Sequence, residues 1–126
     1  MDLQDNRAGD PLRAFKAELF KALAHPTRVK ILDLLRGQAR TVSELQVQLR
    51  IEPSSVSQQL AVLRGKHIVE ARREGTSVYY RIKDPRVSQL LAVARQILTT
   101  ALADSHALLN ELGGEPAPRP AGDRRR

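Results

Sequence analysis

The sequence predicts a mainly α-helical domain that carries one small β-hairpin. Apolar residues recur at helical spacing in five separate segments, which indicates five amphipathic helices. Between the fourth and fifth of these segments, two short runs flank a Glu-Gly pair, which favours a hairpin. The chain has 126 residues, of which 41% are hydrophobic and 28% are charged. This composition is typical of one globular domain with a single core.

The first helix is predicted over residues 10–24. Asp10 is a favourable N-cap residue, and Pro11 suits the first helical position because a backbone N–H has no partner there. Residues 1–9, which precede this start signal, are expected to form a flexible arm.

The second and third helices each begin at a local capping signal. His25-Pro26 ends the first helix and starts the second, with His25 expected to cap it and Gly37 expected to end it. Thr41 is followed three residues later by Glu44, which fits a capping box at the start of the third helix.

The fourth helix is predicted over residues 53–65, after a short turn at Ile51-Glu52. Strands are expected over 68–73 and 77–83, around Glu74-Gly75. In the second strand the residues expected to alternate inward are Val78, Tyr80 and Ile82.

The fifth helix is predicted over residues 84–112. Asp84-Pro85 repeats the pattern of an N-cap followed by a first-turn proline. After this helix, residues 113–126 are rich in proline and arginine, so we expect a disordered basic tail. The folded domain is therefore expected to span residues 10–112.

Two helices joined by a short turn and followed by a hairpin match a winged helix-turn-helix. On a helical wheel of the fourth helix, Val56, Leu60 and Leu63 share one face and are expected to point into the core. The opposite arc carries serine and glutamine, which can bind base edges or phosphates, and the predicted wing carries arginines. The residues predicted to contact double-stranded DNA are Ser54, Ser55, Ser57, Gln58, Gln59, Arg64, Lys66, Arg72, Arg73 and Thr76.

The charge of the chain agrees with a polyanionic partner. Lysine and arginine number 21 against 14 acids, a formal charge of +7. The absence of cysteine excludes disulfides and thiolate metal sites. No apolar run is long enough to span a bilayer and the N-terminus does not resemble a signal peptide, so we expect a cytoplasmic protein without a membrane partner.

Four segments together resemble the ArsR/SmtB family of bacterial winged-helix repressors. They read FKALAHPTRVKILDLL, TVSELQVQL, SSVSQQLAVLR and EGTSVYYRI. The resemblance implies a homodimer formed by the first and last helices. It also implies binding to a palindromic operator and repression that an inducer relieves, in many members a metal ion.

The chain departs from this family at its metal sites. Gln46 and Gln48 replace the two thiolates of the third-helix site, and amides are poor ligands for soft metals. Of the last-helix site only Asp84 matches, while Ile97 and Thr100 stand at ligand positions. We therefore expect no metal or cofactor at these sites. An unidentified small-molecule inducer remains open, as does an unfamiliar metal site formed by Asp104, His106 and Glu111.

His67 is a further departure, because the family usually has glycine at this position. A left-handed backbone there would suit glycine, although histidine tolerates it better than most residues. Alternatively, Gly65 carries the bend.

The last helix carries a broad apolar stripe that a small domain cannot cover, which favours pairing with a second copy of the chain. The residues predicted to form the dimer interface are Leu12, Phe15, Leu19, Leu91, Ala94, Leu98 and Ala101.

The function predicted from these features is sequence-specific transcriptional regulation, with the chain acting as a dimeric repressor. Two alternatives stay open: a sequence-indifferent nucleic-acid binder and a winged-helix protein-interaction module. No nucleophile–base pair, phosphate loop or catalytic carboxylate pair is evident, so we do not expect an enzyme.

Overall fold

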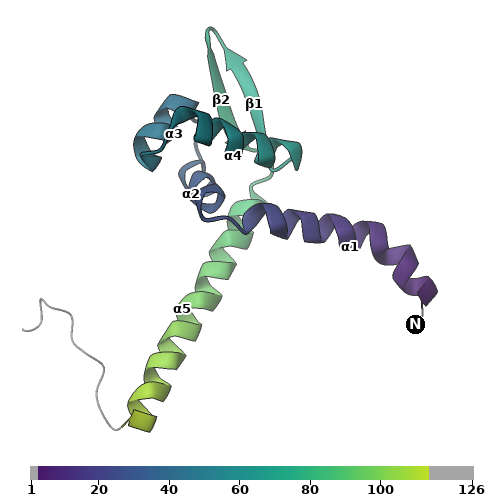
Figure 1. The fold of residues 1–126 in the computed structure, drawn as a ribbon, viewed down its shortest axis with the longest axis vertical. Helices are drawn as coiled ribbons and strands as arrows, with labels where there is room; N and C mark the ends of the chain where they lie inside the picture. The colour runs from purple at the N-terminus through teal and green to yellow at the C-terminus, as the bar shows by residue number, and fades with distance from the viewer. Residues whose placement is uncertain (1–2, 114–126) are drawn as a thin grey trace, which may run out of the picture. The chain divides into compact units, whose positions relative to one another are not determined.

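The structure, a computed structural model, describes residues 3–113 and the side chains of residues 10–113. Its elements follow the predicted order (Figure 1). They are α1 (Leu3–Leu23), α2 (Pro26–Leu34), α3 (Val42–Leu49), α4 (Pro53–Gly65), β1 (Val69–Glu74), β2 (Ser77–Ile82) and α5 (Arg86–Gly113). The chain divides into two compact units, Met1–Ser88 and Gln89–Arg126, and each is described by itself.

Helix α1 begins earlier than predicted. It starts at Leu3 rather than Asp10, and Pro11 lies inside it. The Asp10 carboxylate accepts a hydrogen bond from the Arg13 guanidinium at 2.9 Å. An interior proline removes one backbone hydrogen bond and crowds the carbonyl four residues earlier, yet α1 continues through Pro11, so an Asp-Pro pair does not by itself fix a helix start. Residues 3–9, expected to be an arm, therefore belong to α1.

The starts of α2 and α3 confirm the predicted caps. His25 Nδ1 accepts a hydrogen bond from the Thr27 N–H at 3.1 Å. Thr41 Oγ1 accepts from the Glu44 N–H at 3.1 Å, while Glu44 Oε1 accepts from the Thr41 N–H at 3.0 Å. The first backbone N–H groups of any helix have no partner within the helix, and these bonds satisfy one such donor in each of α2 and α3.

The core of the first unit lies where α2, α3 and α4 meet. Leu45 of α3 is completely buried, as are Val56 and Leu63 of α4, and Leu60 is 1% exposed. This burial confirms the face predicted to point inward. Further apolar side chains complete the core; they are Ala22, Leu23, Ile31, Leu32, Leu35, Ile68 and Val69.

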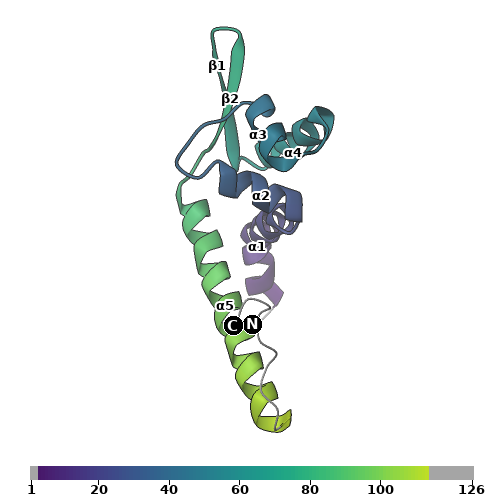
Figure 2. The same cartoon turned by 90° about the vertical axis from the view of Figure 1, so that its left-hand side faces the viewer.

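The two strands form an antiparallel hairpin that extends from the helices in both views (Figures 1 and 2). Its register pairs Val69 with Ile82 and Glu74 with Ser77, and Gly75 at the tip has φ +64°. All six residues of β2 are half-buried, so the predicted inward alternation is not seen as a difference in burial.

A pair of backbone hydrogen bonds joins the base of the hairpin to the loop before α3. The Arg40 N–H donates to the Tyr80 carbonyl at 2.9 Å, and the Tyr80 N–H donates to the Arg40 carbonyl at 2.8 Å. These bonds fix the hairpin to the helices, which completes a winged helix-turn-helix.

The bend between α4 and β1 is carried by His67, which has φ +62°. Gly65 is the last residue of α4 and has no positive φ, so the alternative that this glycine carries the bend is wrong. Histidine is among the residues that tolerate the left-handed region.

Helix α5 contains no buried residue. Its exposed large apolar side chains are Val93, Ile97, Leu98, Leu102, Leu108, Leu109 and Leu112. The predicted helix end is confirmed to within one residue, since α5 ends at Gly113. The remainder of the predicted tail, residues 114–126, lies outside the described residues. None of the described helices combines the length and apolarity that crossing a membrane requires.

The start of α5 is held by Asp84, as predicted. Its Oδ1 accepts from the Arg86 N–H at 3.0 Å, and its Oδ2 accepts from the Arg86 guanidinium at 2.6 Å. These bonds stabilise the carboxylate and lower the pKa of Asp84 to about 2, with the side-chain bond from Arg86 as the largest cause.

We predict a pH-dependent contribution of Asp84 to stability. Because its pKa is lower in the folded chain than the usual 3.8, its contribution is present above pH 3.8 and is lost as the pH falls towards 2. Asp84→Asn should therefore lower the free energy of unfolding at pH 7, and this deficit relative to wild type should narrow between pH 4 and pH 2. Urea denaturation at several pH values measures it.

Asp33→Asn is the matched control, because it removes one exposed carboxylate without changing the start of α5. A deficit of Asp84→Asn that stays constant from pH 7 to pH 2 would contradict the cap's role.

Candidate nucleic-acid interface

Helix α4 has two faces: its apolar residues are buried in the core, and the opposite face exposes polar side chains to solvent. Ser54, Ser57 and Gln58 are exposed, and Ser55 is half-buried. Ala61 and Val62 are also exposed on this helix. No acid lies between Ser54 and Ile68, so no side chain of this segment repels phosphate. The face can donate to and accept from base edges, and its small apolar groups can contact thymine methyls.

Gln59 differs from its neighbours on α4. It is half-buried, and its Oε1 accepts a hydrogen bond from Arg28 Nη1 at 2.8 Å. Gln59 is predicted to contact DNA, yet its side chain has a hydrogen-bond partner inside the fold. Sequence reasoning placed it at the edge of the reading face but did not identify Arg28 as its partner.

The end of α4 carries two cations with different surroundings. Arg64 is exposed. The Lys66 ammonium lies 2.9 Å from Glu18 Oε1 of α1, and the hydrogen bond from Lys66 is the main cause that lowers the pKa of Glu18. Lys21 is also within 3.6 Å of the Glu18 carboxylate. Both pairs are largely exposed and therefore weak, so Lys66 can exchange this carboxylate for another anion.

The wing places two arginines near its tip. Arg72 and Arg73 of β1 are exposed, as is Thr76 beside the turn glycine. Their cross-strand neighbours are Tyr79 for Arg72 and Val78 for Arg73. Exposed guanidinium groups at such a tip are suited to phosphates or to a narrow minor groove.

A cleft of about 400 Å³ lies between α4 and the base of β2. Residues of both α4 and the wing line this cleft, and they include the Ser57 hydroxyl and the Arg64 guanidinium. Tyr80 lines this cleft, although the sequence predicted only an inward-facing strand residue. The lining residues are Ser57, Leu60, Ala61, Arg64, Gly65 and Tyr80.

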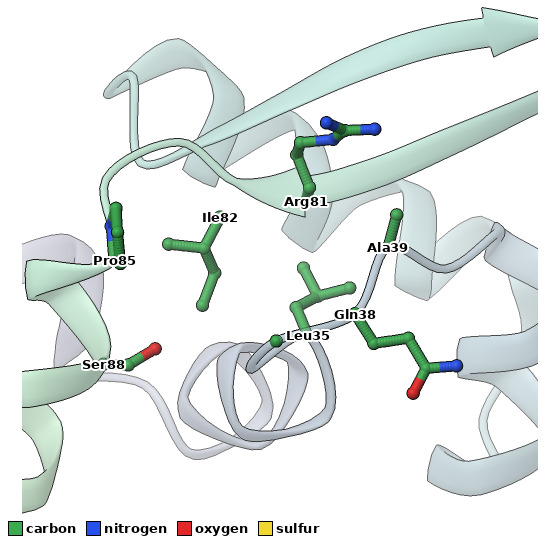
Figure 3. Close-up of a pocket in the computed structure, with 8 residues that line it drawn as sticks. Leu35, Gln38, Ala39, Arg81, Ile82, Pro85 and Ser88 are labelled. Atoms are coloured by element: carbon green, nitrogen blue, oxygen red, sulfur yellow. The ribbon is translucent and has the colours of Figure 1, made fainter.

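A second cavity, of about 370 Å³, lies at the base of the wing (Figure 3). Nε of Arg81 is the one buried side-chain nitrogen or oxygen without a hydrogen-bond partner among the residues that the structure describes. Figure 3 shows that its guanidinium extends away from Pro85 and Ser88, so the polar groups around this cavity do not converge. The lining residues are Leu35, Gly37, Gln38, Ala39, Arg81, Ile82, Pro85 and Ser88.

Within the described part of a single chain, no group of three or more His, Cys, Asp or Glu side chains could hold a metal ion. This includes Asp104, His106 and Glu111, which are all exposed on α5. Gln46 and Gln48 of α3 supply only amides.

Comparison with known proteins shows consistent similarity to bacterial regulators. Residues 25–71 match the family model described as bacterial regulatory protein, arsR family. A Mycobacterium tuberculosis protein named uncharacterized HTH-type transcriptional regulator Rv0081 is 47% identical over 104 residues, which cover 82% of this chain and 91% of that protein. The transcriptional repressor PagR of Bacillus anthracis is 37% identical over 82 residues, covering 64% of this chain and 82% of PagR.

Solved structures agree with this result. The crystal structure of M. tuberculosis Rv0081 has a TM-score of 0.70 at 48% identity, covering 75% of this chain and 96% of that one. The winged helix-turn-helix DNA-binding domain of Mb0332 from Mycobacterium bovis, described as homodimeric, also has a TM-score of 0.70. It is 35% identical and covers 77% of this chain and 90% of that domain.

We predict that Arg73→Ala weakens binding to any DNA duplex and lowers the slope of log affinity against log salt by about one unit, because one phosphate contact is lost. Fluorescence anisotropy with a labelled duplex between about 50 and 200 mM salt measures the slope, a range over which such slopes are resolved. Arg36→Ala, which removes the same charge from an exposed turn after α2, is the control. Equal slopes for wild type and Arg73→Ala would exclude Arg73 from the interface.

Proposed function

The chain belongs to the ArsR family of bacterial regulatory proteins and is a winged helix-turn-helix transcriptional regulator, and we propose that it acts as a homodimeric repressor on a palindromic operator in double-stranded DNA. Its relative PagR is named a transcriptional repressor, which supports the same direction of regulation here. Bacterial DNA lies in the cytoplasm, and we place this activity there.

The observation that carries the proposal is the division of α4 into two faces. Val56, Leu60 and Leu63 are buried, so the serines and Gln58 must face outward. A helix held in this way can enter a major groove while the wing arginines contact the adjacent backbone. If the domain were a protein-interaction module, we would expect acidic or large apolar residues on this face of α4. The relatives are named as regulators, and we propose no catalytic activity.

Exposed apolar side chains support the homodimer. Leu12 and Phe15 of α1 are 69% and 72% exposed, and Leu98 of α5 is 63% exposed. Leaving such side chains in water costs about 1.5–3 kcal/mol each, which burial against a second copy would recover. Mb0332 is described as homodimeric, in agreement with this proposal. Of the other proposed interface residues, Leu19 and Leu91 are half-buried and Ala94 and Ala101 are exposed.

We propose that any inducer is not a thiolate-bound metal. The chain has no cysteine, and the family's thiolate positions on α3 carry Gln46 and Gln48. A small molecule, or a metal held by oxygen and nitrogen ligands, stays compatible with these residues.

The proposal is tested by selecting duplexes from a random pool with the full chain, then comparing the selected duplex with a scrambled one by gel shift. A repressor should prefer the selected duplex by about 10³-fold or more at physiological salt. Equal shifts would instead support a sequence-indifferent nucleic-acid binder.

We predict that Gln58→Ala weakens binding to the selected duplex by about 1–3 kcal/mol, because one amide contact to a base edge is lost. Sedimentation should show an unchanged dimer. Gln48→Ala, at an exposed amide on α3, is the control. Wild-type affinity of Gln58→Ala would remove Gln58 from the reading face.

We predict that Leu98→Asp converts the chain to a monomer at micromolar concentration, because it places a charge in the proposed apolar interface. Sedimentation velocity measures the change. Gln96→Asp introduces the same charge at an exposed polar position of α5 and should remain a dimer. A wild-type chain that sediments as a monomer would refute the proposed assembly.

A further inference from the structure

We propose that Arg28 and Gln59 form a positioning link that sets the rotation of α4 and therefore the direction in which Gln58 faces. This inference rests on the proposed function, because it concerns how the DNA-reading face is held. It assigns to Gln59 a role within the protein in place of a contact with DNA.

Arg28 lies on α2 and reaches back to the end of α1. Its Nε donates to the Ala22 carbonyl at 2.6 Å, and its Nη2 lies 3.4 Å from the Lys21 carbonyl. Carbonyls in the last turn of a helix have no partner within the helix and lie at the negative end of its dipole. A cation at this position therefore holds the end of α1 against α2.

The same guanidinium also reaches α4. Nη1 donates to Gln59 Oε1 at 2.8 Å, across 31 positions of the sequence. One planar group carried by α2 thus binds both α1 and α4, and all its acceptors are neutral oxygens. The planar fork of arginine holds these directions together, whereas a lysine ammonium on its flexible stem would not.

The position of Gln59 explains why this bond controls the reading face. Its neighbours on α4 are Gln58, which is exposed, and Leu60, which is 1% exposed. Successive helical residues point about 100° apart, so a bond at Gln59 fixes the angle at which Gln58 is presented. The hydrophobic effect is non-directional, whereas a hydrogen bond weakens steeply when its angle changes.

The test compares substitutions at Gln59 and Gln58 in the full chain. Gln59→Met keeps the length of the side chain but removes the acceptor. The ratio of affinities for the selected and scrambled duplexes should fall about tenfold, the effect of losing one charge-assisted hydrogen bond. The salt slope should stay unchanged, because no phosphate contact is lost.

Gln59→Glu and Gln58→Glu form the matched pair. A carboxylate at Gln59 keeps the bond to Arg28 and should retain wild-type binding to the selected duplex. The same carboxylate at Gln58 faces DNA and should lower affinity by at least about tenfold through repulsion of phosphate. Equal losses for the two variants would overturn the inference, because Gln59 would then face DNA directly.

Hydrogen exchange without DNA gives a readout that does not depend on the proposed function. Gln59→Met should accelerate exchange of the α4 backbone amides about tenfold relative to those of α3, because local opening follows the lost bond. Unchanged exchange, or an unchanged affinity ratio in a folded Gln59→Met variant, would overturn the positioning role. If wild type selects no sequence, the proposed function fails, while the exchange result still decides whether Arg28 holds α4.

Discussion

The burial of one face of α4 is the constraint on which the rest of the structure depends. Val56, Leu60 and Leu63 exclude water together with Leu45 of α3 and the apolar residues of α2. This packing forces the serines and Gln58 to the exposed side of α4. The polar DNA-reading face is thus a consequence of the core, because burying these three side chains leaves only the opposite side of the helix for contact with DNA.

The wing depends on a second, smaller constraint. A two-stranded hairpin is marginally stable by itself, and here the backbone bonds between Arg40 and Tyr80 attach it to the loop that precedes α3. The capping box at Thr41 begins α3 immediately after this attachment. The position of the wing arginines relative to α4 is therefore set by backbone geometry at the base of the hairpin.

Local signals predicted most of the fold, and long-range contacts escaped prediction. The caps at His25, Thr41 and Asp84 were readable because each cap and its partner lie within three positions. The buried face of α4 followed from helical spacing. The bond between Arg28 and Gln59 joins distant positions, so no local pattern indicated that this glutamine points inward. The start of α1 was misplaced because the Asp-Pro signal is also compatible with a helix interior.

The pair between Lys66 and Glu18 has a thermodynamic consequence for binding to a polyanion. In the free chain Glu18 serves Lys66 as an internal counterion. A phosphate that took over Lys66 would leave this carboxylate with only the longer pair to Lys21 at 3.6 Å, and cations from solution would then gather around it. That uptake offsets part of the cation release from DNA, so Lys66 would add less to the entropy of association than an unpaired lysine.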